Sequence, residues 1–266
     1  MPRRHRLDAE LVRRGLARSR EQAARLVRDG RVAVAGTTAS KPATEVSTDA
    51  AIVVRHGREG PEYVSRGGHK LAGALATLGG PQVEGRRCLD AGASTGGFTD
   101  VLLRAGARQV VAADVGYGQL DWSLRTDQRV VVHDRTNVRD LDPVAIEGLV
   151  DLVVADLSFI SLALVLPAFG RCCHPEGDQL LLVKPQFEVG REMLGRGGVV
   201  RDPEQRVEAV LGVAEKAVAL GWGTRAVTAS PLPGPAGNVE YFVWLQRSAA
   251  PPRRDDVAAA VTAGPQ

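Results

Sequence analysis

The sequence predicts an α/β fold in which a mainly parallel β-sheet, covered by helices on both faces, follows a small α+β module. From about residue 86 onward, apolar strand-like runs alternate with amphipathic helical stretches, which is typical of such a sheet. Residues 1–60 differ, because two short helical stretches there precede several short strands. Charge separates the same two parts: residues 1–60 carry thirteen Arg and Lys against seven Asp and Glu, although the whole chain carries only +3.

Composition bounds the class of protein. A chain of 266 residues with 44% hydrophobic content can bury one full-sized domain and a smaller one. The basic first part favours a nucleic-acid partner, although an excess of arginine can also be a solvated surface. The three cysteines lack Cys-x-x-Cys spacing, which indicates buried thiols in a reducing compartment. No apolar run is long enough for a signal peptide or a membrane span, so we expect a cytoplasmic protein without a membrane partner.

Helix-capping and helix-ending residues predict the elements of the first sixty residues. A helix is expected over 7–16 with Asp8 as its cap, and Ser19 caps a second helix that ends at Gly30. The runs 31–34 and 51–54 then read as strands. Two short helices followed by small strands predict a compact module over residues 1–60.

The spacing within residues 5–36 resembles the S4 RNA-binding domain. An Arg-Leu-Asp-x-x-Leu-Val-x-x-Gly run is followed by Ser-Arg-x-x-Ala-x-x-Leu-Val and then Gly-x-Val-x-Val-x-Gly. In that family the second helix and the turn after it face RNA. The resemblance therefore implies RNA contacts from the basic residues Arg4, Arg6, Arg18, Arg20 and Lys41.

The rest of the chain predicts a larger domain over 65–247, joined by a linker at 61–64. Ser65 caps a helix that ends at Leu78 before two glycines. A long helix is expected over 203–220, and residues 248–266, rich in Ala, Pro and Arg, read as a flexible tail. Strands are expected at 86–90, 109–114, 130–134, 151–155, 179–183, 224–229 and 240–246. The last strand lacks a crossover helix before it, so we expect it to run antiparallel.

A glycine-rich turn after the first of these strands indicates a ligand site. Asp90 ends an apolar run and opens a turn of small residues through Gly97, where a ligand can approach bare backbone at the start of a helix. The spacing fits neither the dinucleotide fingerprint nor a P-loop. Asp114 ends the next strand, where a carboxylate can accept both hydroxyls of a ribose. A nucleoside ligand with an amino-acid tail, S-adenosylmethionine (SAM), suits these features, although any strand–loop–helix unit can hold such a turn.

Two charged residues end other predicted inner strands. Asp156 follows an apolar run, and Lys184 follows another and precedes Pro185, which favours an extended backbone at the lysine. Open α/β sheets keep their active sites at this edge. Lys70 lies on the helix before the sheet, and Glu240 begins the last strand. Each residue taken alone is more often a surface charge or a snorkelling side chain.

Residues 65–246 resemble the hemolysin A (TlyA) family of ribosomal RNA methyltransferases, which is related to FtsJ-type ribose 2′-O-methyltransferases. The resemblance rests on the runs Val-Ser-Arg-Gly-Gly-His-Lys-Leu, Asp-Ala-Gly-Ala-Ser-Thr-Gly-Gly-Phe, Asp-Val-Gly-Tyr-Gly-Gln-Leu, Asp-Leu-Ser-Phe-Ile-Ser, Val-Lys-Pro-Gln-Phe-Glu and Gly-Asn-Val-Glu-Tyr-Phe. It implies a Rossmann-like class I SAM-dependent methyltransferase fold that needs no metal. The implied cofactor contacts are Asp90, Gly92, Ala93, Ser94, Thr95, Gly96, Gly97, Phe98, Asp114, Val115, Asn137 and Asp156, with Asp134 as an alternative to Asn137.

The same resemblance implies a catalytic tetrad of Lys70, Asp156, Lys184 and Glu240. A ribose hydroxyl is a poor nucleophile until its proton is being removed, and an amine can remove it only in its neutral form. Lys184 is the implied base and Lys70 the neighbouring cation. The carboxylate of Asp156 would orient the base, and that of Glu240 would hold the lysines in place.

Further implied RNA contacts lie on the larger domain: Arg66, Arg135, Arg139, Phe159 and Arg191. Phe159 would stack on a flipped nucleotide, although a phenylalanine is more often core, and each arginine could simply be solvated. The branch that the basic N-terminus resembles implies cytidine methylation in 16S and 23S rRNA of ribosomal subunits, capreomycin sensitivity and a monomer. The alternatives are an RNA-binding protein with an inactive methyltransferase domain and a membrane-active hemolysin.

Overall fold

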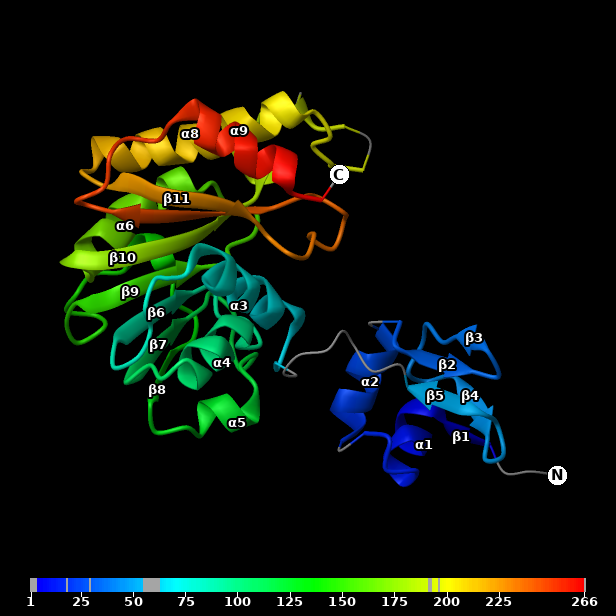
Figure 1. Cartoon of the computed structure of the whole chain (residues 1–266). Helices are drawn as coiled ribbons and strands as arrows, with labels where there is room; N and C mark the ends of the chain where they lie inside the picture. The colour runs from blue at the N-terminus through cyan, green and yellow to red at the C-terminus, as the bar shows by residue number, and fades with distance from the viewer. Residues whose placement is uncertain are drawn as a thin grey trace. The chain divides into compact units, whose positions relative to one another are not determined.

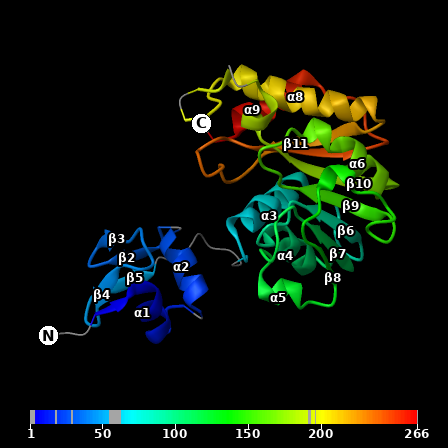
Figure 2. The ribbon, with the colours of Figure 1, turned by 180° about the vertical axis from the view of Figure 1, so that it is seen from behind.

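The computed structural model describes residues 4–17, 19–28, 30–54, 63–190, 193–195 and 197–265. By contacts between residues, the chain divides into two compact units, Met1–Glu62 and Tyr63–Gln266. Each unit is coloured along the chain in Figure 1 and is seen from behind in Figure 2. Within these described residues, no helix is both long and apolar enough to cross a membrane.

Small sheets and two helices build the first unit. Its elements are β1 (Arg4–Arg6), α1 (Leu7–Arg13), α2 (Arg20–Arg28), β2 (Val32–Val34), β3 (Thr37–Thr38), β4 (Glu45–Ser47) and β5 (Ile52–Val54). Strand β2 pairs antiparallel with β3 and β5, and β1 pairs antiparallel with β4. Both helices turn their apolar stripes into one core, in which Leu7, Leu11 and Val27 are buried. The unit therefore has the predicted α+β composition.

The two predicted caps of this unit have different outcomes. Ser19 caps α2, because its hydroxyl accepts a hydrogen bond from the backbone N–H of Gln22 at 3.1 Å. Asp8 was the expected cap of α1, but the helix begins one residue earlier, at Leu7. Asp8 consequently lies inside the first turn, where its buried carboxylate binds the Arg6 guanidinium at 2.9 Å. The Asp8 carboxylate therefore has the Arg6 guanidinium as its ion-pair partner and does not cap the helix.

A seven-stranded sheet in the order β11-β12-β10-β9-β6-β7-β8 forms the second unit. Its strands are β6 (Arg87–Ala91), β7 (Gln109–Ala113), β8 (Val130–His133), β9 (Val150–Ala155), β10 (Cys173–Val183), β11 (Gly223–Ala229) and β12 (Tyr241–Gln246). Strands β8, β7, β6, β9 and β10 pair in parallel. Strand β12 lies antiparallel between β10 and β11, as its missing crossover helix predicts. Strand β10 begins six residues before the predicted start, because a register shift between Cys173 and Asp178 lets the early residues join the sheet.

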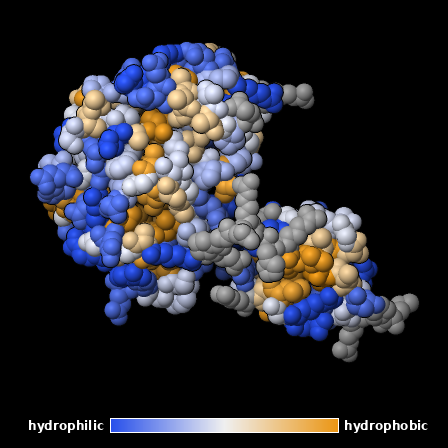
Figure 3. Space-filling view, in the orientation of Figure 1, coloured by the Kyte–Doolittle hydropathy of each residue, from blue (hydrophilic) through white to orange (hydrophobic). Residues whose placement is uncertain are grey.

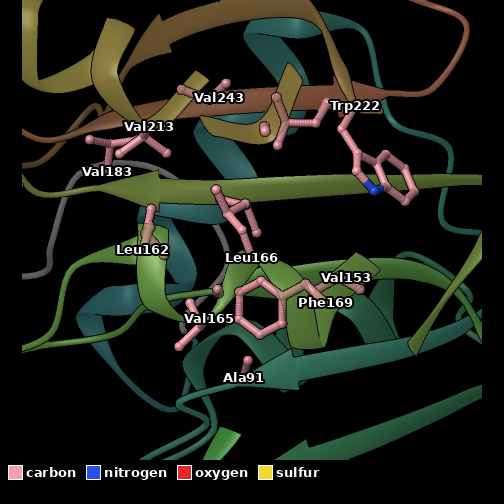
Figure 4. Close-up of a cluster of buried hydrophobic side chains, with 14 of the residues drawn as sticks. Ala91, Val153, Leu162, Val165, Leu166, Phe169, Val183, Val213, Trp222 and Val243 are labelled. Atoms are coloured by element: carbon pink, nitrogen blue, oxygen red, sulfur yellow. The ribbon is translucent and has the colours of Figure 1, made fainter. Parts of the chain in front are cut away.

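Helices cover the sheet on both faces. Two separate apolar cores result, one with residues of α6, α8 and α9 and the other with residues of α3, α4 and α5. Figure 4 shows part of the first core, where Leu166 and Phe169 pack near the strands and Trp222 lies farther along. The helices are α3 (Arg66–Leu78), α4 (Gly97–Arg104), α5 (Trp122–Arg125), α6 (Leu166–Cys172), α7 (Pro185–Glu188), α8 (Pro203–Ala219) and α9 (Arg254–Ala263), with short 3-10 turns η1 (Val138–Asp140) and η2 (Leu162–Leu164).

The C-terminal segment is not the flexible tail that its composition suggests. Residues 254–263 form α9, which packs on α8 and β11 and lies beside α8 in Figure 1. Val257, Ala260 and Val261 are buried, and their spacing of three and four residues puts them on one helix face. Hydrophilic residues gather along this outer edge in Figure 3. The prediction was wrong because the high alanine and proline content of residues 248–266 hid the short apolar stripe of α9.

The α8–α9 contact yields a stability prediction. Val257→Asp would place a carboxylate without a partner in this interface and should lower the free energy of unfolding by about 3 kcal/mol or more. Ala259→Asp puts the same charge on the exposed face of α9 and should change it by less than about 0.5 kcal/mol. Urea unfolding of the three proteins checks this. Equal stability of the two variants would mean that α9 does not dock.

Candidate active site

The glycine turn at the end of β6 is shaped by close backbone packing. Gly92 has a φ of +85°, and a Cβ atom there would lie 2.8 Å from the carbonyl oxygen of Asp156. Gly96 has a φ of +94°, and a Cβ atom there would strike the side chain of Leu124. Both positions therefore require glycine. Helix α4 begins directly afterwards, so the backbone N–H groups of its first turn lie next to the glycine turn.

Asp114 holds this turn in place from the end of β7. Its two carboxylate oxygens accept hydrogen bonds from the backbone N–H groups of Ser94 at 2.8 Å and Gly116 at 2.7 Å. A carboxylate has further lone pairs, which suit the hydroxyls of a ribose. The side chain of Val115 beside it is mostly exposed, as a flat contact for an adenine requires. Gln119 was missed by sequence reasoning: its amide oxygen lies 3.4 Å from the Ser94 hydroxyl, although its place in the Asp-Val-Gly-Tyr-Gly-Gln run was a signal.

Asp90 and Phe98, on either side of the turn in the sequence, are both buried. The Asp90 carboxylate is completely buried and accepts a hydrogen bond from the Thr99 hydroxyl at 2.6 Å. The Phe98 ring packs on Phe242 in the core, with 6.0 Å between ring centroids. Asp90 lies in β6 and Phe98 in the first turn of α4, and the contact of both residues with the cofactor stays a prediction. Ala93 is also buried, whereas Ser94 and Thr95 are exposed on the turn.

The two alternatives for the adenine contact follow β8. Thr136 donates its backbone N–H to the carbonyl of Asp114 at 2.8 Å, which brings this loop beside the presumed ribose position. Asp134 is bound by Arg125 at 2.8 Å, and this guanidinium lowers the pKa of the carboxyl. Asn137 is exposed, and its side-chain oxygen accepts from the N–H of Arg139. The Asn137 amide thus keeps its N–H donors for a ligand, which favours it over Asp134.

Strand register brings the predicted tetrad to one edge of the sheet. Val183 pairs with Tyr241 across the antiparallel strands β10 and β12, so the next residues along, Lys184 and Glu240, lie opposite each other. On the other side of β10, β9 runs in parallel and ends just before Asp156. Three chain segments therefore deliver charged side chains to the same place.

Two ion pairs form there. The Lys184 ammonium lies 2.7 Å from the Asp156 carboxylate, and the Lys70 ammonium donates to the Glu240 carboxylate at 2.6 Å. Lys70, Lys184 and Glu240 are each at most 8% exposed. The pairs are neighbours, because a Cβ atom on Gly67, one turn before Lys70, would lie 3.7 Å from the Asp156 carboxylate. The structure thus brings the four predicted residues together beside the glycine turn.

The loop after Asp156 adds two features. Lys184 also donates a hydrogen bond to the Ser158 hydroxyl at 2.9 Å, which sequence reasoning missed. Phe159 is 91% exposed and has a φ of +64°, so the alternative that it belongs to the core is wrong. Its ring centroid lies 5.2 Å from that of Phe187. An exposed aromatic ring in a strained backbone conformation next to the ion pairs indicates a ligand contact.

The predicted RNA-binding residues that the structure describes are exposed, and several have partners. Arg6 and Arg20 share the carboxylate of Asp8, at 2.9 and 3.4 Å, and the Arg6 hydrogen bond lowers the pKa of that carboxyl to about 2. The Arg135 guanidinium lies 4.4 Å from the centre of the Tyr117 ring. Arg4, Lys41, Arg66 and Arg139 are also exposed, whereas Arg18 and Arg191 lie outside the described residues.

Asp90 yields a prediction about pH. Burial raises the pKa of its carboxyl to about 7 in the folded protein, from the ordinary 3.8. The unfolded chain therefore loses the proton first, and the free energy of unfolding should fall as pH rises from about 4 to about 7. Asp90→Asn has no proton to lose and still accepts from Thr99, so it should lack this fall. Urea unfolding at several pH values without cofactor compares the two, and identical pH profiles would contradict the assignment.

Comparisons with known proteins match this geometry. A family model described as FtsJ-like methyltransferase matches residues 63–247, and one described as S4 domain matches residues 5–52. The chain is 60% identical, over the whole of both chains, to a Mycobacterium tuberculosis protein named 16S/23S rRNA (cytidine-2′-O)-methyltransferase TlyA. It is 37% identical, over 68% of this chain and 70% of the relative, to a Campylobacter jejuni protein named 23S rRNA (cytidine-2′-O)-methyltransferase TlyA.

A solved structure extends the likeness to both units. It is named a hemolysin, from Streptococcus thermophilus, and is 38% identical with a TM-score of 0.77, covering 98% of this chain and 95% of its own. The matched length spans both the small first unit and the seven-stranded sheet of this chain. The chain belongs to the TlyA family of FtsJ-like methyltransferases and carries an S4 domain ahead of the methyltransferase domain.

Proposed function

We propose that this protein transfers a methyl group from SAM to the 2′-oxygen of cytidines in 16S and 23S rRNA. The observation that carries the proposal is the pair of buried lysine–carboxylate contacts, Lys184–Asp156 and Lys70–Glu240, beside the glycine turn. The name of the Mycobacterium tuberculosis relative supports the substrate, at 60% identity over both chains. Ribosomal RNA as substrate implies action in the cytoplasm. A monomer, no metal and capreomycin sensitivity stay predictions.

The residues at the turn suit SAM. Gly92 and Gly96 leave room where side chains would clash, and Asp114 is fixed by two backbone N–H groups with acceptor capacity remaining. We assign the methionine end to the turn, the ribose to Asp114 and the adenine to Val115 with Asn137. When bound, SAM supplies a methyl carbon on a positively charged sulfur.

Lys184 is the proposed base. As the 2′-oxygen bonds to the methyl carbon and the bond from that carbon to the sulfur breaks, with its electron pair left on a neutral thioether, the Lys184 amine takes the hydroxyl proton. The Asp156 carboxylate stabilises the ammonium that results. Ser158 can accept a hydrogen bond from the ammonium and donate one to the amine, so it holds Lys184 in both states. Lys70, fixed by Glu240, is the second cation of the proposed site. Holding the reactants in line should supply much of the rate.

RNA contacts are proposed on both units. Arg4, Arg6, Arg20 and Lys41 on the S4 domain and Arg66, Arg135 and Arg139 on the methyltransferase domain are exposed cations. The exposed ring of Phe159, one residue from the Lys184 partner Ser158, is placed to stack on the base of the target nucleotide. Arg18 and Arg191 are proposed on sequence alone.

The proposal predicts the outcome of two substitutions of one residue. Lys184→Ala should lower kcat by about a hundredfold or more, as expected for a lost general base. Lys184→Arg keeps the positive charge beside Asp156 but cannot give up its proton, so it should be equally inactive. Both variants should bind SAM nearly as well as the wild type.

Transfer of labelled methyl groups to ribosomal subunits, with mass-spectrometric mapping of the ribose methyl, measures this activity. Calorimetry measures the affinity for SAM. Wild-type turnover by Lys184→Arg would exclude Lys184 as the base. A wild-type protein that binds rRNA and SAM without methylating would favour the inactive RNA-binding alternative.

The S4 assignment predicts a change in salt dependence. If Arg20 contacts one phosphate, Arg20→Ala should weaken rRNA binding and reduce the slope of log affinity against log salt by about 0.9. Arg13→Ala removes the same charge from α1, where Arg13 is bound by Glu10 at 2.6 Å, and should leave the slope unchanged. Filter binding at several salt concentrations distinguishes the two. Equal slopes for both variants would remove Arg20 from the interface.

A further inference from the structure

The five-residue loop 157–161 presents Phe159 in a conformation that its own backbone does not favour. Its φ of +64° lies in the left-handed region, which a residue with a branched or bulky side chain rarely adopts. The ring is also 91% exposed, so burial does not hold it there. Such strain persists only where the surrounding structure fixes the backbone on both sides.

Fixed points lie on each side of Phe159. Before it, the Ser158 hydroxyl accepts a hydrogen bond from Lys184 at 2.9 Å. After it, both oxygens of the Glu188 carboxylate are used: the Ser161 hydroxyl donates to one at 2.6 Å, and the Leu162 backbone N–H donates to the other at 2.8 Å. The loop therefore cannot relax at Phe159 without breaking one of these bonds.

The two anchoring residues come from one short segment. Lys184 precedes α7 and Glu188 ends it, so the proposed base and the second anchor are separated by four residues. Between them lies Phe187, whose ring centroid is 5.2 Å from that of Phe159 and 6.0 Å from the Lys184 ammonium. A shift of the loop would therefore move the exposed ring relative to the base itself.

We propose that Glu188 is a positioning residue for methyl transfer, which fixes loop 157–161 and so sets Phe159 over the target base in register with Lys184. This inference rests on the proposed function, because it assigns to Phe159 a contact with the target nucleotide. Glu188 touches neither the reacting atoms nor the glycine turn. Its variants should therefore affect the use of RNA and spare the binding of SAM.

The chemistry of the contact supports an ionised Glu188. A carboxylate accepts from two donors at once, as the Ser161 hydroxyl and the Leu162 N–H require. Burial raises the pKa of this carboxyl, and the two hydrogen bonds and the Lys216 ammonium of α8 oppose that rise. Burying a carboxylate costs free energy unless it is hydrogen-bonded. The two hydrogen bonds from Ser161 and Leu162 offset this cost and fix the carboxylate in place.

Steady-state kinetics on ribosomal subunits with the full-length protein test the proposal. Glu188→Ala should lower kcat/KM for the RNA by about tenfold to a hundredfold, because displaced reactants lose rate steeply. Its affinity for SAM should stay within about twofold, because Glu188 binds Ser161 and Leu162, neither of which is assigned to SAM. Glu188→Gln keeps an oxygen for the Leu162 N–H and gains an amide N–H that can donate to the Ser161 hydroxyl, so it should restore most of the activity. Glu215→Ala, an exposed glutamate on α8, is the matched control and should behave as wild type.

A double-mutant cycle separates positioning from general damage. If Glu188 acts through Phe159, adding Glu188→Ala to Phe159→Ala should cost less than about threefold, because coupled residues are not additive. Full additivity, or a Glu188→Ala variant as active as wild type, would overturn the proposal. Should Glu188→Ala fold poorly in thermal unfolding, Ser161→Ala removes one bond only and should show the same selective loss. A wild type that methylates no rRNA would instead refute the proposed function.

Discussion

The antiparallel pairing of β12 with β10 is the constraint on which the site depends. Residues of β10 and β12 are far apart in sequence, yet the pairing of Val183 with Tyr241 sets Lys184 opposite Glu240. A slip of one residue would turn every side chain of β12 to the other face of the sheet. Glu240 would then point away from Lys70, which lies on α3. The buried side chains of β12, such as Phe242 and Val243, make such a slip costly, so two apolar cores fix the catalytic register.

Stability alone does not explain the charges that this register brings together. Removing two ions from water costs free energy that their attraction often fails to offset, and apolar residues of similar size are frequently as stable. Lys70, Lys184 and Glu240 are nevertheless almost completely buried. Pairing each amine with a carboxylate limits the cost, and the arrangement leaves a basic nitrogen at the edge of the sheet where a substrate can approach. This cost supports the catalytic role that we propose for the tetrad.

Patterns along the chain were sufficient to predict the strands of the seven-stranded sheet, including the antiparallel last one, because each holds an apolar run. In the first unit β1, β3 and β4 were missed, because they are two or three residues long and mostly polar. The four tetrad residues were proposed because each lies in a motif that resembles a known family. The helix α9 was missed because only Val257, Ala260 and Val261 mark its buried face. The sequence did not single out Ser158, Gln119 and Glu188 as residues of the site, for another reason. Their roles come from hydrogen bonds to partners in other segments, and no local pattern records such contacts.

The place of β11 in the sheet has a consequence for folding during synthesis. Among the residues that the structure describes, strand β11 pairs with β12 alone, and β12 lies between it and β10. During synthesis β11 therefore cannot join the sheet until the residues of β12 have emerged. Glu240 arrives with that same last strand. A nascent chain thus carries the glycine turn that follows β6 long before it carries all four charged residues of the tetrad.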